Sequence, residues 1–174
     1  NQYLIANIRY DPAKDFEAVA ILTVGAPFVF AANPGEPYKN VKELIAYAKA
    51  NPGKLSYAVD VSSGLGLVAA RAFVKRAKLD IVEVPYRSTP QMIQDTMAGR
   101  VPMLLAAIPP VEALMRDGKL TPVTFSSEKR FPTFPDVSVI AEEIPGFNID
   151  GWLTVVAPTG VPLDIRQKVG GEIV

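Results

Sequence analysis

The chain has 174 residues, which is enough for one domain or two small lobes. Eighteen Lys and Arg residues balance eighteen Asp and Glu residues, so we expect no nucleic-acid partner, because such binders carry a basic excess. The sequence has no Cys and no His, which excludes disulfides, thiolate nucleophiles, Cys-zinc sites and every Ser-His-Asp triad. No apolar run approaches the roughly 18 residues that cross a bilayer, so we expect no direct membrane insertion.

Strand-like and helix-like segments alternate along the chain. Residues 19–32 predict strands broken at Gly25 and Pro27, and Asn40 with Glu43 fits a capping box at the start of a helix. The later segments, in chain order, are a strand at 55–59, a helix at 64–77, a strand at 80–86, a helix from 89 to 99 with Thr89 as its cap, a strand at 101–107, a helix at 110–117, a strand at 120–125, a short helix at 138–143, a strand at 151–158 and the start of a helix at 162–169. This alternation predicts an α/β fold with a largely parallel sheet.

The strand-to-helix junction at residues 59–66 has the composition of an anion site. In parallel sheets, ligands bind beyond the carboxyl ends of the strands, at helix N-termini. Ser62 and Ser63 can cap a helix whose first-turn N–H groups attract a carboxylate, although they can equally be ordinary caps. Asp60 argues against an anion, because its own carboxylate could occupy those donors.

A second junction, at residues 86–91, faces the same predicted edge of the sheet. Thr89 begins the helix there, and Tyr86 and Arg87 could supply a phenol and a cation. Taken singly, a packed tyrosine and a solvated arginine are the simpler interpretations. Asp95 lies in the middle of the predicted helix and is better interpreted as a surface or structural residue than as a catalytic one.

The glycines of the first junction suggest an alternative, a Rossmann-like dinucleotide-binding domain of an oxidoreductase. Residues 64–69 fit G-x-G-x-x-A, and Glu83 follows where a ribose-binding acid belongs. That fingerprint needs its first glycine at the turn directly after the strand, whereas residues 60–63 intervene here. The strand of Glu83 is also expected to continue past it. No G-x-S-x-G elbow is present, and we predict no enzymatic activity.

Five stretches appear in the order and spacing of one protein family. They are "YDPAKDFEAVAILTVGAPFVFAANP", "VKELIAYAKANPGKLSYA", "VPYRSTPQMIQDTMAGRVPMLL", "KRFPTFPDVSVIAEEIPGF" and "GWLTVVAPTGVP". Together they resemble the tripartite tricarboxylate transporter substrate-binding proteins, also called the Bug family, over essentially the whole chain. The resemblance implies a periplasmic-binding-protein-like (type 2) fold, in which two α/β lobes are joined by crossing strands.

The resemblance also implies a function. Such proteins are periplasmic, close on a small organic acid like a Venus flytrap, and deliver it to the membrane subunits of a transporter. They usually hold carboxylates with backbone N–H groups and waters at strand-to-helix loops. The expected ligand is therefore a small carboxylate, with no cofactor.

Lobe boundaries follow by analogy with the family. Residues 31–153 would form lobe 2, and residues 1–30 and 154–174 would be parts of lobe 1, with crossings near Phe30 and Trp152. The family has a further N-terminal strand–helix segment and more helix after the position of Val174. We therefore expect a chain truncated at both ends, which binds its ligand weakly by itself.

The first junction departs from the family pattern, which after "YA" resembles S-S-G-x-G-S-x-x-H-L. Asp60 and Gly64 stand where serines are usual, Val61 and Ser63 where glycines are, Leu67 where the histidine is, and Ser88 replaces a usual glycine of the second junction. We expect an altered pocket, in which Asp60 could recognise an amino group or a hydroxyl of the ligand. The predicted ligand-binding residues are Asp60, Val61, Ser62, Ser63, Gly64, Tyr86, Ser88 and Thr89.

Overall fold

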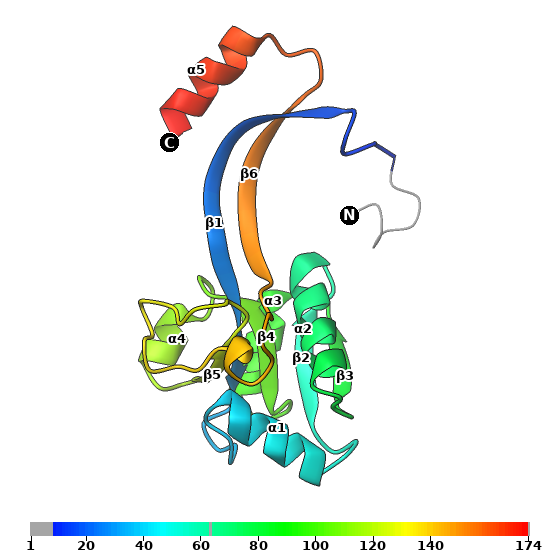
Figure 1. Ribbon diagram of the computed structural model, residues 1–174, viewed down its shortest axis with the longest axis vertical. Coiled ribbons are helices and arrows are strands. Elements are labelled where there is room, and N and C mark those ends of the chain that lie inside the picture. Colours follow the sequence, from blue (N-terminus) through cyan, green and yellow to red (C-terminus); the bar gives the residue numbers. More distant parts are fainter. Residues whose placement is uncertain (1–8, 63, 174) are drawn as a thin grey trace. The chain divides into compact units, whose positions relative to one another are not determined.

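The structure is a computed structural model that describes residues 9–62 and 64–173. The chain forms two compact units: unit 1 comprises Asn1–Gly25 and Trp152–Val174, and unit 2 comprises Ala26–Gly151 (Figure 1). The chain passes between the units after Gly25 and again after Gly151, each time within a β-strand. Among the described residues, no helix has both the length and the apolar character needed to cross a membrane.

Unit 2 is built on a mixed sheet. Its strand order is β3-β2-β4-β1-β5, and β6 pairs with β1. The strands are β1 (Phe16–Ala32), β2 (Ser56–Asp60), β3 (Val82–Tyr86), β4 (Met103–Ala107), β5 (Thr121–Phe125) and β6 (Asp150–Pro158). Strand β2 runs parallel to β3 and β4, as the sequence predicts, whereas β1 runs antiparallel to β4 and β5. The carboxyl ends of β2, β3 and β4 therefore share one edge of the sheet.

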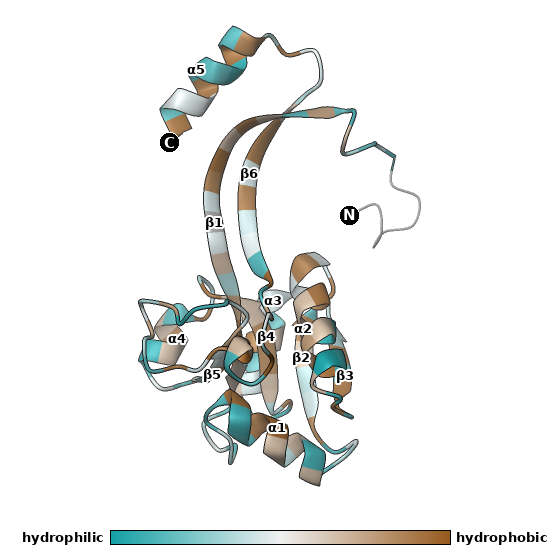
Figure 2. Ribbon diagram, in the orientation of Figure 1, coloured by the Kyte–Doolittle hydropathy of each residue, from teal (hydrophilic) through white to brown (hydrophobic). Residues whose placement is uncertain are grey.

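Helices cover both faces of this sheet. They are α1 (Val41–Ala50), α2 (Gly64–Arg76), α3 (Thr89–Met97) and α4 (Glu112–Arg116). Unit 2 also contains a 3₁₀ turn, η1 (Ile140–Glu142), and unit 1 contains the helix α5 (Leu163–Ile173). Asn40 caps α1 as predicted, since its Oδ1 accepts a hydrogen bond from Glu43 N–H, but the Glu43 carboxylate returns to Lys39 N–H instead of to Asn40. Figure 2 shows both hydrophilic and apolar residues on the helices, as expected of helices that cover one face of a sheet.

The core has two parts because alternate residues of each strand point to opposite faces of the sheet. Phe28, Phe30 and Ala32 of β1 pack with α1 and α2, whereas Val29 and Ala31 pack with α3 and α4. Phe73 of α2, Phe30 and Tyr57 form the aromatic centre of the first part. This packing holds β2, β3 and the starts of α2 and α3 in fixed positions within unit 2.

The predicted breaks in β1 at Gly25 and Pro27 are wrong, because β1 is continuous from Phe16 to Ala32. Gly25 adopts φ +72°, a left-handed conformation that glycine allows without interrupting the strand. Pro27 lies just before Phe28, where the pairing with β4 begins, so its missing N–H removes no donor from that ladder.

Candidate ligand-binding site

Asp60 joins the two predicted junctions. It is the last residue of β2, pairs in register with Tyr86 of β3, and is only 8% exposed. Its Oδ1 accepts hydrogen bonds from Ser62 N–H (2.9 Å) and Ser62 Oγ (2.6 Å), and its Oδ2 accepts one from Thr89 Oγ1 (2.6 Å). Burial by itself would raise the pKa of Asp60, but these hydrogen bonds outweigh it and lower the pKa below its ordinary value. The carboxylate is therefore ionised at neutral pH.

The backbone donors predicted for the first junction have partners within the chain. Val61 N–H donates to Tyr86 C=O at 3.0 Å, and Gly64 N–H donates to Ser62 C=O at 3.1 Å. Ser62 N–H is held by Asp60, as described above. Ser63, the remaining predicted residue of this junction, lies outside the described residues. The aspartate thus occupies donors that the sequence analysis had assigned to a ligand carboxylate.

The second junction differs from its prediction in one respect. Thr89 is not the helix cap: Ser88 holds the N-cap position in an extended conformation, and Thr89 and Pro90 are the first residues of α3. The Ser88 side chain makes no capping hydrogen bond. The Thr89 hydroxyl points to Asp60, because an ionised carboxylate on the neighbouring strand is a stronger acceptor than a backbone group.

Tyr86 is fixed by a small polar cluster. Its hydroxyl donates to Asp95 Oδ2 at 2.9 Å, and Asp95 also pairs with Arg100 at 2.7 Å. The hydrogen bonds from Arg100 and then Tyr86 lower the pKa of Asp95. Asp95 is thus a structural partner, in agreement with its interpretation from the sequence, and Tyr86 is oriented beside the Asp60 junction.

The geometry gives no support to the dinucleotide alternative. Gly64 and Gly66 lie inside the first turn of α2, not at a turn directly after β2. Glu83 lies within β3 and accepts hydrogen bonds from Arg71 (2.8 and 2.9 Å) and Tyr57 (2.8 Å). A carboxylate held in this way is a bridge between α2 and the sheet, and it is not free to bind a ribose.

Asp150 is a polar residue that the sequence analysis missed. It begins β6, and its Oδ1 is buried without a hydrogen-bond partner among the described residues. Burial, followed by the negative charge of Glu128, raises the pKa of Asp150. The available signal was an acidic residue directly before the apolar stretch of residues 151–158.

Replacement of Asp150 by asparagine should stabilise unit 2 at neutral pH. A raised carboxyl pKa means that the ionised form is disfavoured in the folded state, so the penalty is absent below the ordinary pKa and grows as pH rises through the raised value. We expect Asp150→Asn to gain up to about 1 kcal/mol at pH 7, since solvent screens a partly exposed group, and nothing at pH 3. Urea unfolding at both pH values measures this gain. Glu128→Gln should give part of it, and an equal gain at both pH values would contradict the assignment.

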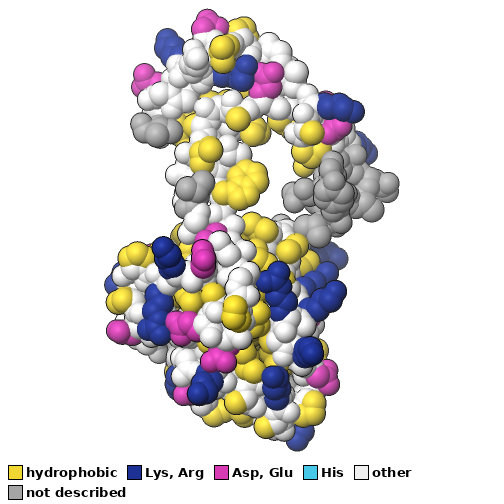
Figure 3. Space-filling view, in the orientation of Figure 1, with side chains coloured by type: hydrophobic (Ala, Val, Ile, Leu, Met, Phe, Trp, Pro, Cys, Tyr) yellow, Lys and Arg dark blue, Asp and Glu magenta, His cyan; other side chains and the backbone are white. Residues whose placement is uncertain are grey.

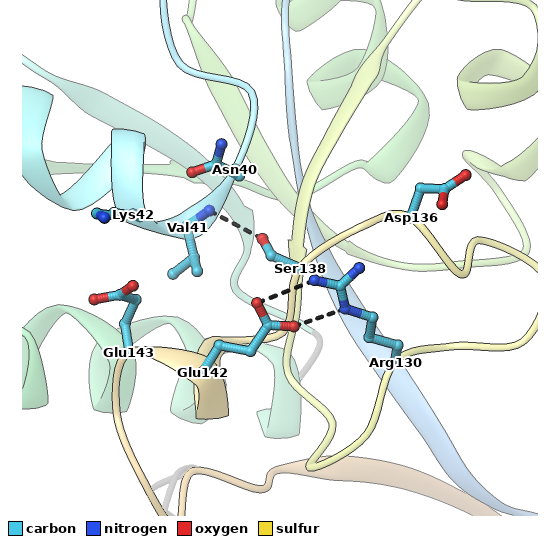
Figure 4. Close-up of a pocket in the computed structure, with 8 residues that line it drawn as sticks. All are labelled: Asn40, Val41, Lys42, Arg130, Asp136, Ser138, Glu142 and Glu143. Atoms are coloured by element: carbon cyan, nitrogen blue, oxygen red, sulfur yellow. Dashed lines mark hydrogen bonds and ion pairs between the residues drawn. The ribbon is translucent and has the colours of Figure 1, made fainter.

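A separate cavity of about 330 Å³ lies between the start of α1 and the segment that follows β5 (Figure 4). Some of its polar groups are paired: Arg130 with Glu142 at 2.8 Å, and Ser138 Oγ with Val41 N–H and Val123 C=O. Basic and acidic side chains both line this cavity, so its charge does not favour anionic over cationic ligands. Among the described residues, no cluster of three or more His, Cys, Asp or Glu side chains could hold a metal ion.

The sheet order, the shared strand β1 and the two units define the fold of periplasmic binding proteins, and the predicted fold class is confirmed. Residues 1–172 match the family described as tripartite tricarboxylate transporter family receptors. The chain belongs to this family, as the sequence motifs indicated.

The chain spans about half the length of several curated relatives that it matches. It is 29% identical to a UPF0065 protein from the tcbD-tcbE intergenic region of Pseudomonas sp. (strain P51), over 99% of this chain and 52% of that protein. Among solved structures, Rpa4515 of R. palustris with adipate superposes with a TM-score of 0.89 at 29% identity, over 98% of this chain and 57% of that one. MatC of Rhodopseudomonas palustris with bound malate gives a TM-score of 0.83 at 26% identity, over 98% and 58%.

Proposed function

We propose that the chain is part of a periplasmic solute-binding protein that captures a small organic acid and delivers it to the membrane subunits of a tripartite tricarboxylate-type transporter. The observation that carries this proposal is the family match over residues 1–172. Two structural relatives hold dicarboxylates, adipate and malate, which supports an acid as the ligand. The protein acts by binding and release, without catalysis.

We infer that unit 2, Ala26–Gly151, corresponds to lobe 2 and unit 1 to part of lobe 1, so that the lobe boundaries lie a few residues before those predicted after Phe30 and Leu153. Support comes from the relatives' length and from unit 1, whose apolar side chains are widely exposed (Figure 3). Trp152 and Ile21 are each 62% exposed, and no residue of α5 that the structure describes is buried. A part of a lobe would have such a surface, because its apolar residues pack against the rest of that lobe.

The ligand site would lie at the edge of the unit 2 sheet where β2 and β3 end. Support comes from parallel strand ends that bring two helix starts together, which is where ligands of α/β sheets bind. The residues assigned to it are those predicted from the sequence, with Asp60 between Ser62 and Thr89. Closure of two lobes over a shared ligand would stabilise the closed form.

A thermal-shift panel tests this function on the longest polypeptide that the gene encodes. The panel contains dicarboxylates, tricarboxylates, amino acids and nicotinamide dinucleotides. At a ligand concentration of 100 Kd, we expect one acid to stabilise the protein by about 2.7 kcal/mol through mass action, and dinucleotides to have no effect. Stabilisation by a dinucleotide and by no acid would overturn the proposal.

A further inference from the structure

The hydroxyl protons of Ser62 and Thr89 are both directed to Asp60. Ser62 Oγ and Thr89 Oγ1 each have one proton, and each lies 2.6 Å from an Asp60 oxygen. An ionised carboxylate can only accept hydrogen bonds, so both hydroxyls must donate to it. What these two hydroxyls still offer to a ligand is lone pairs.

Three backbone donors beside Asp60 are also used within the chain. The N–H groups of Val61, Ser62 and Gly64 all have acceptors within the chain. Asp60 Oδ2 accepts the Thr89 hydroxyl and retains a further lone pair, and the residue keeps a small exposed fraction of 8%. These groups thus present acceptors and a negative charge, the reverse of a carboxylate cradle.

This polarity determines which ligand group can face the junction. A ligand carboxylate would meet a second carboxylate and two oxygen lone pairs, and like charges at such distances repel. A protonated amine has three N–H donors and a positive charge, so it can bind Asp60 and the two hydroxyl oxygens together. The geometry suits an ammonium group of a small molecule better than any acidic group.

We propose that Asp60 makes this receptor selective for acids that also carry a protonated amine, with the amine bound at Asp60, Ser62 and Thr89. The inference rests on the proposed function, since it names the ligand class of that same site. It assigns Asp60 as the specificity-determining residue. The carboxylate of such a ligand would then be bound elsewhere than at the Asp60 carboxylate.

Matched ligand pairs test the inference in the full-length polypeptide. Aspartate and succinate differ by one amino group, as do glutamate and glutarate. Isothermal titration should show that the amino member of at least one pair binds about tenfold to a hundredfold tighter than its deaminated partner, because a charge-assisted hydrogen bond to a buried group has that effect. This comparison needs no variant, so it holds even where a substitution prevents folding.

Two substitutions of Asp60 test whether this residue causes the preference for the amino member of each pair. Asp60→Asn keeps the shape but removes the charge, and should abolish the preference for the amino member. Asp60→Ser releases the donors of Ser62 and Thr89, and should shift the preference toward the deaminated acid. Glu142→Gln is the matched control, because it removes one negative charge elsewhere in unit 2, in an ion pair with Arg130. It should leave the ratio of affinities unchanged, and circular dichroism checks that each variant folds.

The outcomes separate this inference from the proposed function. If succinate or glutarate binds as well as its amino partner and Asp60→Asn leaves the ratio unchanged, the inference is wrong while the acid receptor stands. If no acid of either kind binds in the titrations or the thermal panel, the proposed function itself fails.

Discussion

Replacement of Phe73 by alanine should lower the free energy of unfolding of unit 2 by about 3–5 kcal/mol. Phe73 is completely buried on the inner face of α2, 5.1 Å from the Phe30 ring and 6.5 Å from the Phe147 ring, measured between centroids. Removing the ring leaves a cavity that the sheet on one side and the 140s segment on the other cannot close. Because whole domains are stable by only about 5–15 kcal/mol, this loss is a large share of the total.

Urea unfolding followed by far-UV circular dichroism measures this effect. Leu65→Ala is the matched control, since Leu65 lies on the same helix but is 37% exposed. Its expected cost is below about 1 kcal/mol, because little apolar area returns to water. Equal losses in the two variants would show that α2 does not pack on the sheet as described.

Replacement of Ser126 by alanine should cost about 2–4 kcal/mol, because one buried and one part-buried backbone group are left without partners. Ser126 Oγ accepts a hydrogen bond from Phe28 N–H at 2.8 Å and donates one to Ile149 C=O at 2.8 Å. It therefore ties β1 to the segment that leads into β6, within unit 2. We expect the variant to weaken this connection selectively.

Ser127→Ala is the control for Ser126→Ala. Ser127 is the next residue and is also buried, but its hydroxyl makes only a local hydrogen bond to Lys129 C=O. Its loss should cost about 1 kcal/mol or less. Native-state hydrogen exchange provides a second measurement, since protection of the Phe28 amide should fall in Ser126→Ala and persist in Ser127→Ala. Unchanged protection of that amide in both variants would contradict the assigned role.

The order of strands and helices could be predicted from the sequence because each signal is local. Asn40 marks the start of α1, Gly99 follows the end of α3, and apolar runs mark the buried strands. The direction of β1 within the sheet could not be predicted, since a strand buried on both faces gives a continuous apolar run whichever way its neighbours run. Its continuity through Gly25 also depends on the partner strands, not on the local sequence.

The predicted site residues came from two separate stretches, and the sequence placed both at helix starts. It also suggested that Asp60 could occupy the donors near it, and the structure shows this for Ser62. The bond from Thr89 was not predicted, because a local reading assigned its hydroxyl to the helix cap. Asp150 was missed because an acidic residue before an apolar stretch does not show by itself whether its carboxylate is buried.

The sequence by itself determined the alternation of elements, the absence of His and Cys chemistry, and membership of a receptor family through motifs spread over the chain. Only the tertiary structure decided the hydrogen-bond polarity of the junction. Asp60 and Thr89 are 29 residues apart and meet because β2 and β3 lie side by side in parallel register. A carboxylate in that position accepts the hydrogen bonds of its neighbours. The side chains expected to donate to a ligand therefore present oxygen lone pairs to it instead.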